Sequence, residues 1–163
     1  MSVDTGFTLL RVVDYSKCIG CETCEAVCGF VHELGPFIKL YDLGGGVKKP
    51  ISCFHCSKAP CIEACPTGAM RKDTQGAVYV EPSKCIGCMA CLYACPFGIP
   101  EFSEVTRTSI KCDLCRDLRR EGLTPACVAM CPTRAIIVGP PRAIGDEVKK
   151  RALARIVYLG ELK

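Results

Sequence analysis

The sequence predicts an α+β protein of short hairpins and short helices, followed by one longer C-terminal helix. Three observations predict this class. Sixteen cysteines fall into four groups of four. Short β-prone runs alternate with turn residues between these groups. The segment after a pair of prolines has the spacing of apolar residues that is typical of a helix.

The β-prone runs, which we expect to form small hairpins, are residues 7–13, 37–41, 77–80 and 135–138. The three consecutive glycines at 44–46 predict a flexible connection between the first and second cysteine groups. Pro140-Pro141 closes the cysteine region. Asp146 is expected to cap a helix that runs to about residue 159. Its apolar face, which we expect to pack on the same domain in preference to a partner, comprises Val148, Ala152, Ile156 and Leu159.

Length and cysteine content limit the functional class. A chain of 163 residues has room for one compact domain or two small lobes, and not for a separate catalytic domain. Cysteine makes up nearly a tenth of it, which indicates a disulfide scaffold or metal sites. The N-terminus lacks a secretory pattern, so we expect a cytoplasmic protein. Because eight disulfides would not persist in a reducing cytosol, we interpret the cysteines as thiolate ligands; disulfide-rich hyperthermophile proteins keep the alternative open.

Two further features concern the source and the membrane. No stretch approaches the roughly twenty apolar residues that span a bilayer. The sequence has no Asn and a single Gln, Gln75. Since these amides degrade at high temperature, their depletion indicates a thermophilic source.

The cysteine groups form an internal repeat. Ser16-Lys17-Cys18-Ile19-Gly20-Cys21 recurs as Ser83-Lys84-Cys85-Ile86-Gly87-Cys88, and the next two cysteines follow at the same offsets both times. No cysteine is left over. The groups are Cys18, Cys21, Cys24, Cys28; Cys53, Cys56, Cys61, Cys65; Cys85, Cys88, Cys91, Cys95; and Cys112, Cys115, Cys127, Cys131.

These spacings are typical of 4Fe-4S clusters. A Cys-x2-Cys-x2-Cys run wraps three sulfurs around one cluster in a tight loop, in which Gly20 and Gly87 permit the turn. The next cysteine starts a helix and cannot reach the same cluster, so it ligates a neighbouring one and the clusters come in pairs. Proline follows the last cysteine of three groups, whereas Gly29 follows Cys28. Zinc sites lack this cysteine-proline pattern, although a zinc-stabilised interaction or nucleic-acid module remains an alternative.

Bound clusters would change the net charge of the protein. The formal charge of +4 counts every cysteine as neutral. An oxidised core of about +2 with four thiolates adds about −2, so four clusters bring the chain to about −4. A basic nucleic-acid surface is therefore not expected.

Residues 61–96 resemble a bacterial two-cluster ferredoxin. Residues 7–140 resemble the four-cluster electron-transfer subunits of molybdopterin and tungstopterin oxidoreductases, such as formate dehydrogenases and aldehyde oxidoreductases. Two features carry this resemblance: the Cys-x-His-Cys run at 53–56, and the long insert between Cys115 and Cys127 that simple ferredoxins lack. The resemblance implies two interleaved ferredoxin-like dicluster modules: residues 1–48 and 106–140 are the halves of an outer module, 49–105 form an inner module, and 141–163 form a helical tail.

The resemblance also implies the ligand sets of four 4Fe-4S clusters. Some relatives replace a cysteine of the third group and bind a 3Fe cluster, but all four are present here. The implied sets are Cys53, Cys56, Cys61, Cys95; Cys85, Cys88, Cys91, Cys65; Cys18, Cys21, Cys24, Cys131; and Cys112, Cys115, Cys127, Cys28.

The expected function is electron transfer without catalysis on this chain. No Ser-His-Asp set, P-loop or dinucleotide fingerprint is present. The resemblance implies a large catalytic partner, with a tungsten or molybdenum pterin aldehyde oxidoreductase or a formate dehydrogenase favoured, and ferredoxin or another carrier. A hydrogenase or carbon monoxide dehydrogenase is the alternative partner.

Lys17, Lys84 and Lys111 each precede a cysteine group, and they either favour cluster reduction or are solvated surface lysines. The cluster beside His55 already has four thiolates, so we interpret this residue as one that supports the ligands or packs beside them, with a redox-linked role as the alternative.

Overall fold

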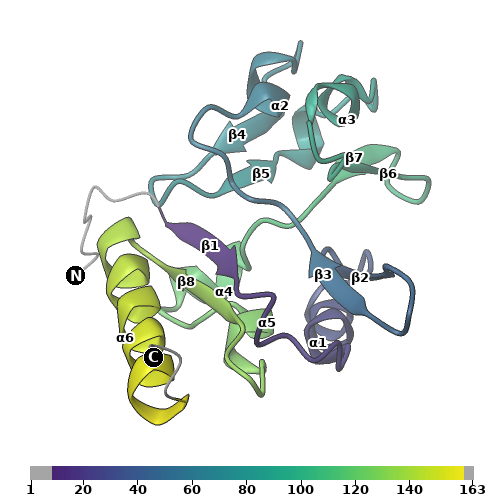
Figure 1. Ribbon diagram of the computed structural model, residues 1–163. Coiled ribbons are helices and arrows are strands. Elements are labelled where there is room, and N and C mark those ends of the chain that lie inside the picture. Colours follow the sequence, from purple (N-terminus) through teal and green to yellow (C-terminus); the bar gives the residue numbers. More distant parts are fainter. Residues whose placement is uncertain (1–8, 160–163) are drawn as a thin grey trace.

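The computed structural model describes residues 9–159 and confirms the α+β class (Figure 1). The helices are α1 Thr23–Val31, α2 Pro60–Glu63, α3 Ala90–Ala94, α4 Arg116–Arg120, α5 Ala126–Ala129 and α6 Pro141–Leu159, with a 3-10 turn at Pro82–Lys84. The strands are β1 Leu10–Val13, β2 Lys39–Asp42, β3 Lys48–Ile51, β4 Met70–Lys72, β5 Val78–Val80, β6 Glu101–Ser103, β7 Thr108–Ile110 and β8 Ile136–Gly139. Within these residues the strands form four two-stranded antiparallel sheets.

The outermost strands pair across the whole length of the chain. β1 lies antiparallel to β8, with Leu10 opposite Gly139 and Val13 opposite Ile136 (Figure 1). The prediction that residues 7–13 and 135–138 form local hairpins is therefore wrong, because each run finds its partner in the other; residues 7 and 8 lie outside the described residues. This pairing brings the first and last cysteine groups into one half of the molecule.

The other sheets are local hairpins. β2 pairs with β3, β4 with β5 and β6 with β7. The connection predicted at residues 44–46 is the turn of the β2–β3 hairpin: its three glycines all have positive φ, and Val47 N donates to Gly44 O at 3.1 Å. The β6–β7 hairpin was not predicted from the sequence.

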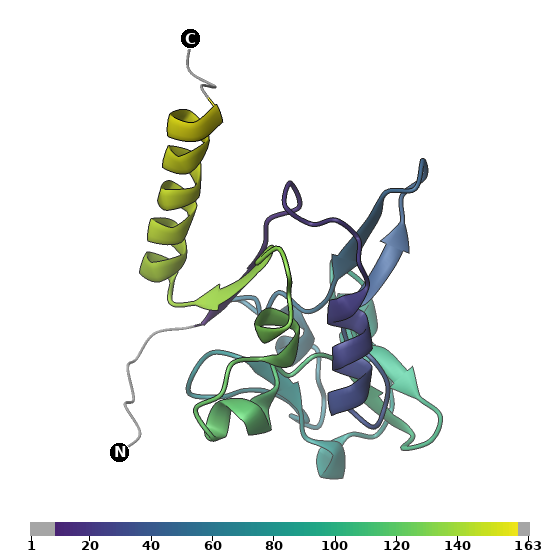
Figure 2. The same ribbon diagram turned by 90° about the horizontal axis from the view of Figure 1, so that it is seen from below.

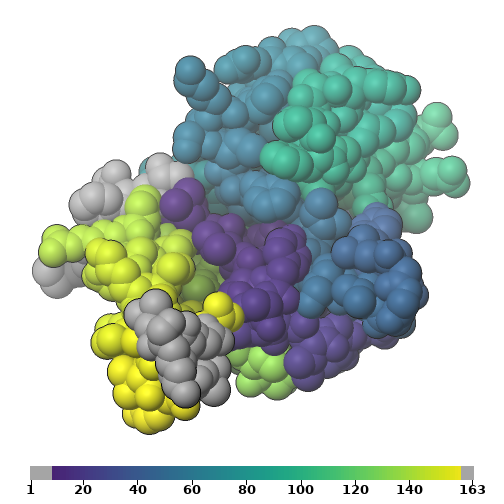
Figure 3. All heavy atoms as spheres, in the orientation of Figure 1, coloured from purple at the N-terminus to yellow at the C-terminus, as the bar shows by residue number. Residues whose placement is uncertain are grey.

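The short helices pack in two pairs, and each pair forms a small core with cysteines in it. α1 packs on α5, and α2 packs on α3. One apolar cluster contains Cys24, Cys28 and Cys127 with Ile38 and Ile136. The other contains Cys61 and Cys91 with Ala59, Met70 and Val78. In Figure 3 the teal middle of the chain gathers on one side, and the purple and yellow ends lie together on the other.

The C-terminal helix differs from its prediction at its start and in its contact face. α6 begins at Pro141, where a proline at the first helical position loses no hydrogen bond, and not at Asp146. It projects from the body beside β8 (Figure 2). Val148 and Ile156 are 50% and 41% exposed, so they do not form the predicted packed face; the side chain of residue 159 lies outside the described residues.

α6 is held mainly by polar contacts instead. Ile144 is buried, and the Arg151 guanidinium contacts Asp14 at 3.4 Å, Glu147 at 2.9 Å and the Arg134 carbonyl at 2.8 Å. The side of the helix that faces the body is therefore the side that carries Arg151.

Candidate metal centre

The fold brings the sixteen cysteines together in four sets of four, and each set draws on two sequence groups. Three sets each line one cavity, and we name each set by one of its members. The Cys18 set is Cys18, Cys21, Cys24 and Cys131; the Cys53 set is Cys53, Cys56, Cys61 and Cys95; and the Cys85 set is Cys65, Cys85, Cys88 and Cys91.

The remaining four cysteines, Cys28, Cys112, Cys115 and Cys127, form the Cys112 set. They lie close enough together that the negative charges of the other three all raise the pKa of the Cys127 thiol, although burial is the largest cause. All sixteen cysteines are free of disulfides. Within residues 9–159, no three His, Cys, Asp or Glu side chains converge closely enough to share a single metal ion.

The four sets adjoin one another in the order Cys18, Cys112, Cys53 and Cys85, and we call this succession of neighbouring sets the row. The Cys18 and Cys112 sets adjoin because Cys24 and Cys28 lie on α1 and Cys127 and Cys131 lie on or next to α5. The Cys53 and Cys85 sets adjoin in the same way across α2 and α3. The Cys112 and Cys53 sets meet between the two halves, where the charge of Cys53 raises the pKa of Cys112 and the ring of His55 reaches the Cys112 sulfur.

Solvent exposure marks the two ends of the row. Cys21, in the Cys18 set, and Cys88, in the Cys85 set, are the two exposed cysteines. In contrast, all four members of the Cys112 set are buried. Ile19 and Ile86, which precede the exposed cysteines by two residues, are 70% and 66% exposed. The internal repeat therefore places the same apolar and accessible loop at each end.

The cysteine loops depend on glycine at the two positions that the repeat predicts. Gly20 and Gly87 have φ of +71° and +70°, a region that side chains other than glycine rarely adopt. A Cβ at Gly87 would lie 2.7 Å from the Arg107 carbonyl oxygen. Glu22 and Met89, two residues further on, also have positive φ and are the N-cap residues of α1 and α3. Both copies of the repeat thus adopt the same tight backbone path.

Backbone N–H groups point at sulfur in every set. Phe37 N donates to Cys28 Sγ at 3.2 Å, and Ala135 N donates to Cys131 Sγ at 3.2 Å. Further N–H donors reach the sulfurs of Cys53, Cys65, Cys85 and Cys112 at 3.3–3.5 Å. A neutral thiol is a weak acceptor, whereas an iron-bound thiolate is a strong one. These donors therefore fit sulfurs that carry the charge of a bound iron–sulfur cluster.

Burial acts against ionisation of the free thiols. Desolvation raises the pKa of Cys24, Cys61 and Cys115 to about 11 and that of Cys127 to about 12. At Cys65 and Cys131 burial also raises the pKa, but hydrogen bonds from backbone N–H groups outweigh it and the pKa is lowered. The buried thiolates need positive charge beside them, which iron supplies, so cluster binding releases protons and stabilises the fold.

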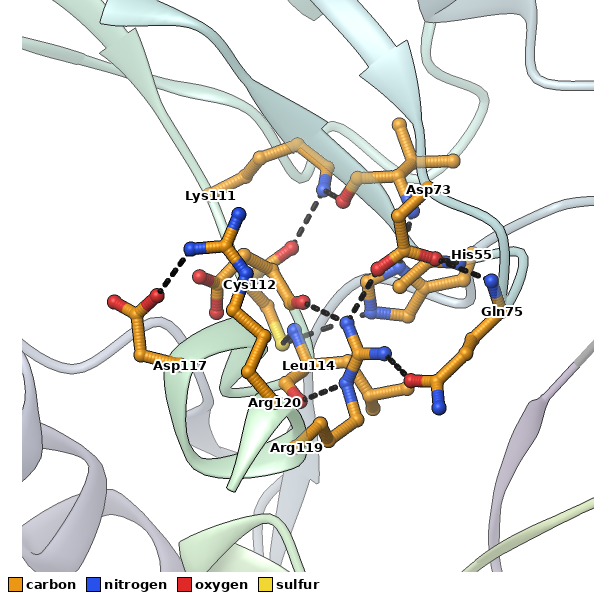
Figure 4. Close-up of polar contacts among 12 residues, drawn as sticks. His55, Asp73, Gln75, Lys111, Cys112, Leu114, Asp117, Arg119 and Arg120 are labelled. Carbon is orange, nitrogen blue, oxygen red and sulfur yellow. Dashed lines mark hydrogen bonds and ion pairs between the residues drawn. The ribbon is translucent and has the colours of Figure 1, made fainter. Parts of the chain in front are cut away.

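A buried polar network lies where the two halves of the molecule meet (Figure 4). His55 is 0% exposed; Val78 N donates to its Nδ1 at 2.9 Å, and its Nε2 lies 3.7 Å from Cys112 Sγ. Burial first, and then the positive charges of Lys111, Arg11 and Arg119, lower the pKa of His55 to about 2. His55 is therefore neutral and lies between the Cys53 and Cys112 sets, and its ring contacts the Cys112 set and not the set of its own loop.

The three lysines ahead of cysteine groups differ in their surroundings. Lys111 is buried, and its Nζ donates to the carbonyl oxygens of Val78 and Cys112. Burial raises the pKa of Cys112 and of Cys61, and the positive charge of Lys111 makes this rise smaller. Lys84 is exposed and Lys17 is half-buried. A role beside a cluster therefore fits Lys111 best.

Three contributors to the metal centre were missed from the sequence. Arg11 is 4% exposed and donates to the carbonyl oxygens of Ser52 and Cys53. His32 Nε2 lies 3.6 Å from Cys115 Sγ, and its ring packs on Phe37. Arg119 links α4 to the β4–β5 turn through Asp73 at 2.7 Å. No local spacing signals these contacts, because each joins segments far apart in the chain.

A larger groove of about 590 Å³ has no cysteine in its lining. The β2–β3 hairpin and the loop after Cys95 line it, with Tyr41, Leu43 and Phe97 among its apolar side chains. No cysteine lines it, so the groove is not part of the metal centre.

Comparison with known families identifies this arrangement. Residues 47–140 match the 4Fe-4S dicluster domain, and residues 11–30 match a 4Fe-4S binding domain. The chain belongs to the 4Fe-4S dicluster domain family. Its cofactors are four 4Fe-4S clusters. This match favours iron–sulfur over the zinc module that the sequence left open.

Curated relatives of this dicluster protein cover most of its length. The B subunit of the anaerobic dimethyl sulfoxide reductase of Escherichia coli (strain K12) is 38% identical over an alignment of 157 residues, and the match covers 85% of this protein and 75% of the relative. Thiosulfate reductase electron transfer subunit PhsB of Salmonella typhi is 36% identical over an alignment of 160 residues, and the match covers 89% of this protein and 81% of the relative. No helix within residues 9–159 has both the length and the hydropathy needed to cross a bilayer.

Proposed function

We propose that this protein is a non-catalytic electron-transfer subunit, which relays electrons between a pterin-dependent oxidoreductase subunit and a second electron carrier. The observation that carries the proposal is the row of four cysteine sets with an exposed cysteine at each end. A row that is buried in the middle and accessible at both ends suits passage between two partners. A single-site redox enzyme would need only one accessible end.

We propose the four sets as the ligand sets of the four clusters. Each set then takes three sulfurs from one cysteine group and the fourth sulfur from the group paired with it, as in dicluster ferredoxins. In the second and fourth groups, the third of these sulfurs comes from a cysteine further along the chain than the Cys-x2-Cys-x2-Cys spacing would place it. The cavities lined by the Cys18, Cys53 and Cys85 sets support this assignment. Two interleaved modules, with 1–48 and 106–140 around 49–105, follow from the same assignment.

A bound 4Fe-4S cluster supplies one-electron redox chemistry at a potential that the protein tunes. The residues of this chain hold the sulfurs, exclude water and donate hydrogen bonds to them. Backbone N–H donors stabilise negative charge at each set, and the buried cations Arg11 and Lys111 add to this at the Cys112 set.

The candidates for the catalytic partner can be ranked. The names of the relatives favour a subunit that reduces a sulfoxide or thiosulfate. The aldehyde oxidoreductase or formate dehydrogenase expected from the sequence is the second candidate, with tungsten in place of molybdenum if the depletion of Asn and Gln reflects a hot habitat. A hydrogenase or carbon monoxide dehydrogenase ranks below both. Ferredoxin is a candidate carrier, and thiolate-rich chemistry favours a cytoplasmic location.

Anaerobic purification from the native organism tests the proposal. We expect a large subunit that carries molybdenum or tungsten to co-elute, and its substrate to reduce or oxidise the clusters of this protein. The two exposed ends supply a matched pair of variants, Ile19→Lys and Ile86→Lys, which leave the ligands in place. Each should slow electron exchange with a different partner; a protein that purifies alone and exchanges no electrons with any large subunit would refute the proposal.

A further inference from the structure

Both histidines of the chain lie against sulfurs of the same cysteine set. The sequence contains two histidines, His32 and His55. His55 Nε2 is 3.7 Å from Cys112 Sγ, and His32 Nε2 is 3.6 Å from Cys115 Sγ. Cys112 and Cys115 both belong to the Cys112 set, which is the most buried of the four. Within residues 9–159, no histidine side chain contacts a cysteine sulfur of the other three sets.

Geometry fixes the direction of the His55 hydrogen bond. Val78 N donates to Nδ1 at 2.9 Å, so Nδ1 is the acceptor and the ring proton is on Nε2. Nε2–H faces Cys112 Sγ, and a sulfur bonded to iron carries no hydrogen and can only accept. At His32 the sulfur alone sets the direction: an iron-bound Cys115 sulfur can only accept, so His32 Nε2–H is the donor. Because His55 is completely buried, no water competes for its bond.

The backbone at His55 supports a dedicated role for its side chain. His55 has φ of +50°, a left-handed conformation that residues other than glycine rarely adopt. It also sits between Cys53 and Cys56, so its backbone belongs to the Cys53 set while its ring donates to the Cys112 set. His55 therefore bridges two neighbouring sets.

Burial alone would make the Cys112 cluster hard to reduce. Reduction adds a negative charge, and low dielectric surroundings disfavour the more highly charged state. A cluster of much lower potential in the interior of the row would oppose electron passage between the two ends. Donors to its sulfurs act in the opposite direction, because they stabilise the added charge.

We propose that His55 and His32 are positioning residues that raise the reduction potential of the cluster held by Cys28, Cys112, Cys115 and Cys127, and so keep the interior of the row reducible. This inference rests on the ligand sets proposed above. The histidines form and break no covalent bond. The electron that the Cys112 cluster gains comes from a neighbouring cluster, which is oxidised as the Cys112 cluster is reduced. Arg11 and Lys111 assist by charge, whereas the histidines act as hydrogen-bond donors.

Two variants remove the donors with little other change. Asn tolerates positive φ and offers its side-chain oxygen to Val78 N in place of Nδ1, so His55→Asn removes the Nε2–H donor and retains the acceptor. His32→Phe preserves the packing on Phe37, since the ring centroids are 4.8 Å apart and only the sulfur contact is lost. The intact complex, prepared anaerobically, is titrated electrochemically while the clusters are followed by electron paramagnetic resonance.

Each variant should keep about sixteen irons and lower the midpoint of one and the same cluster, by about tenfold in its reduction equilibrium, or about 59 mV for one electron. The double variant should lower it further, and the other three midpoints should stay in place. Unmoved midpoints, or two variants that act on different clusters, would overturn the inference. If His55→Asn loses iron, the midpoint measured for His32→Phe decides whether the inference holds. A wild-type protein that holds far fewer than sixteen irons would instead overturn the proposed function.

Discussion

Arg119 joins the two halves of the molecule, and its loss should weaken them measurably. Its guanidinium donates to Asp73 Oδ2 at 2.7 Å, to the Gln75 side chain and to the carbonyl oxygens of Asp113 and Leu114 (Figure 4). The side chains of Arg119 and Asp73 are only 6% and 14% exposed. Arg119→Ala would leave a nearly buried carboxylate without its cation.

The structure sets the size of the effect. Removing one partner of a buried ion pair typically costs about 3–5 kcal/mol. Asp73 would keep hydrogen bonds from the backbone N–H groups of Gln75 and Ala77, both at 2.9 Å, so the lower end of about 3 kcal/mol applies. Because 1.4 kcal/mol is a factor of ten, the folding equilibrium should shift about a hundredfold.

A protein with bound clusters does not unfold as a simple two-state system, so the assay is a rate. The visible absorbance of the clusters is followed anaerobically after transfer into guanidinium chloride, and Arg119→Ala should bleach up to about a hundredfold faster than wild type. Arg120→Ala is the matched control on the same helix, since its pair with Asp117 is 61% and 88% exposed and should contribute little. Equal bleaching rates for the two variants would refute this reasoning.

The cysteine loops and α6 can be tested by three further substitutions. Gly87→Ala should abolish iron retention, whereas Gly98→Ala, with a similar positive φ but open space around it, should retain iron and cost only about 1–2 kcal/mol; equal retention would show that the close backbone contact does not matter. Cys91→Ser should lower the iron content from about sixteen by one to four atoms, with the catalytic partner still active toward an artificial acceptor; an unchanged content would remove Cys91 from the ligands. Asp14→Asn should weaken the Arg151 contact and speed hydrogen exchange in α6 at constant iron content, and unchanged exchange would mean that the ion pair does not anchor the helix.

The parts of the site that the sequence predicts are those encoded locally. Three of the sulfurs in the Cys18 and Cys85 sets come from one short loop, so Cys-x2-Cys-x2-Cys spacing is sufficient to group them. The positive φ of Gly20 and Gly87 is likewise a property of one turn. The resemblance supplied the cysteine that completes each set from a distant group, which spacing alone does not provide.

The parts that the sequence does not predict depend on contacts between distant segments. β1 and β8 each look like half of a local hairpin, and only the fold shows that they pair with each other. The contacts of His32 with Cys115 and of Arg11 with Cys53 have no periodic signal. The apolar residues of α6 predicted a packed face, but Arg151 and its ion pairs fix a different side of the helix against the body.

Iron, acid-labile sulfide and zinc, counted together on one anaerobic preparation of the wild-type protein, test most directly whether the cysteine sets hold four cubane clusters. Four occupied sets predict about sixteen iron and about sixteen sulfide per molecule, with no stoichiometric zinc. About eight of each would leave only one dicluster module filled, and zinc without sulfide would contradict the account altogether.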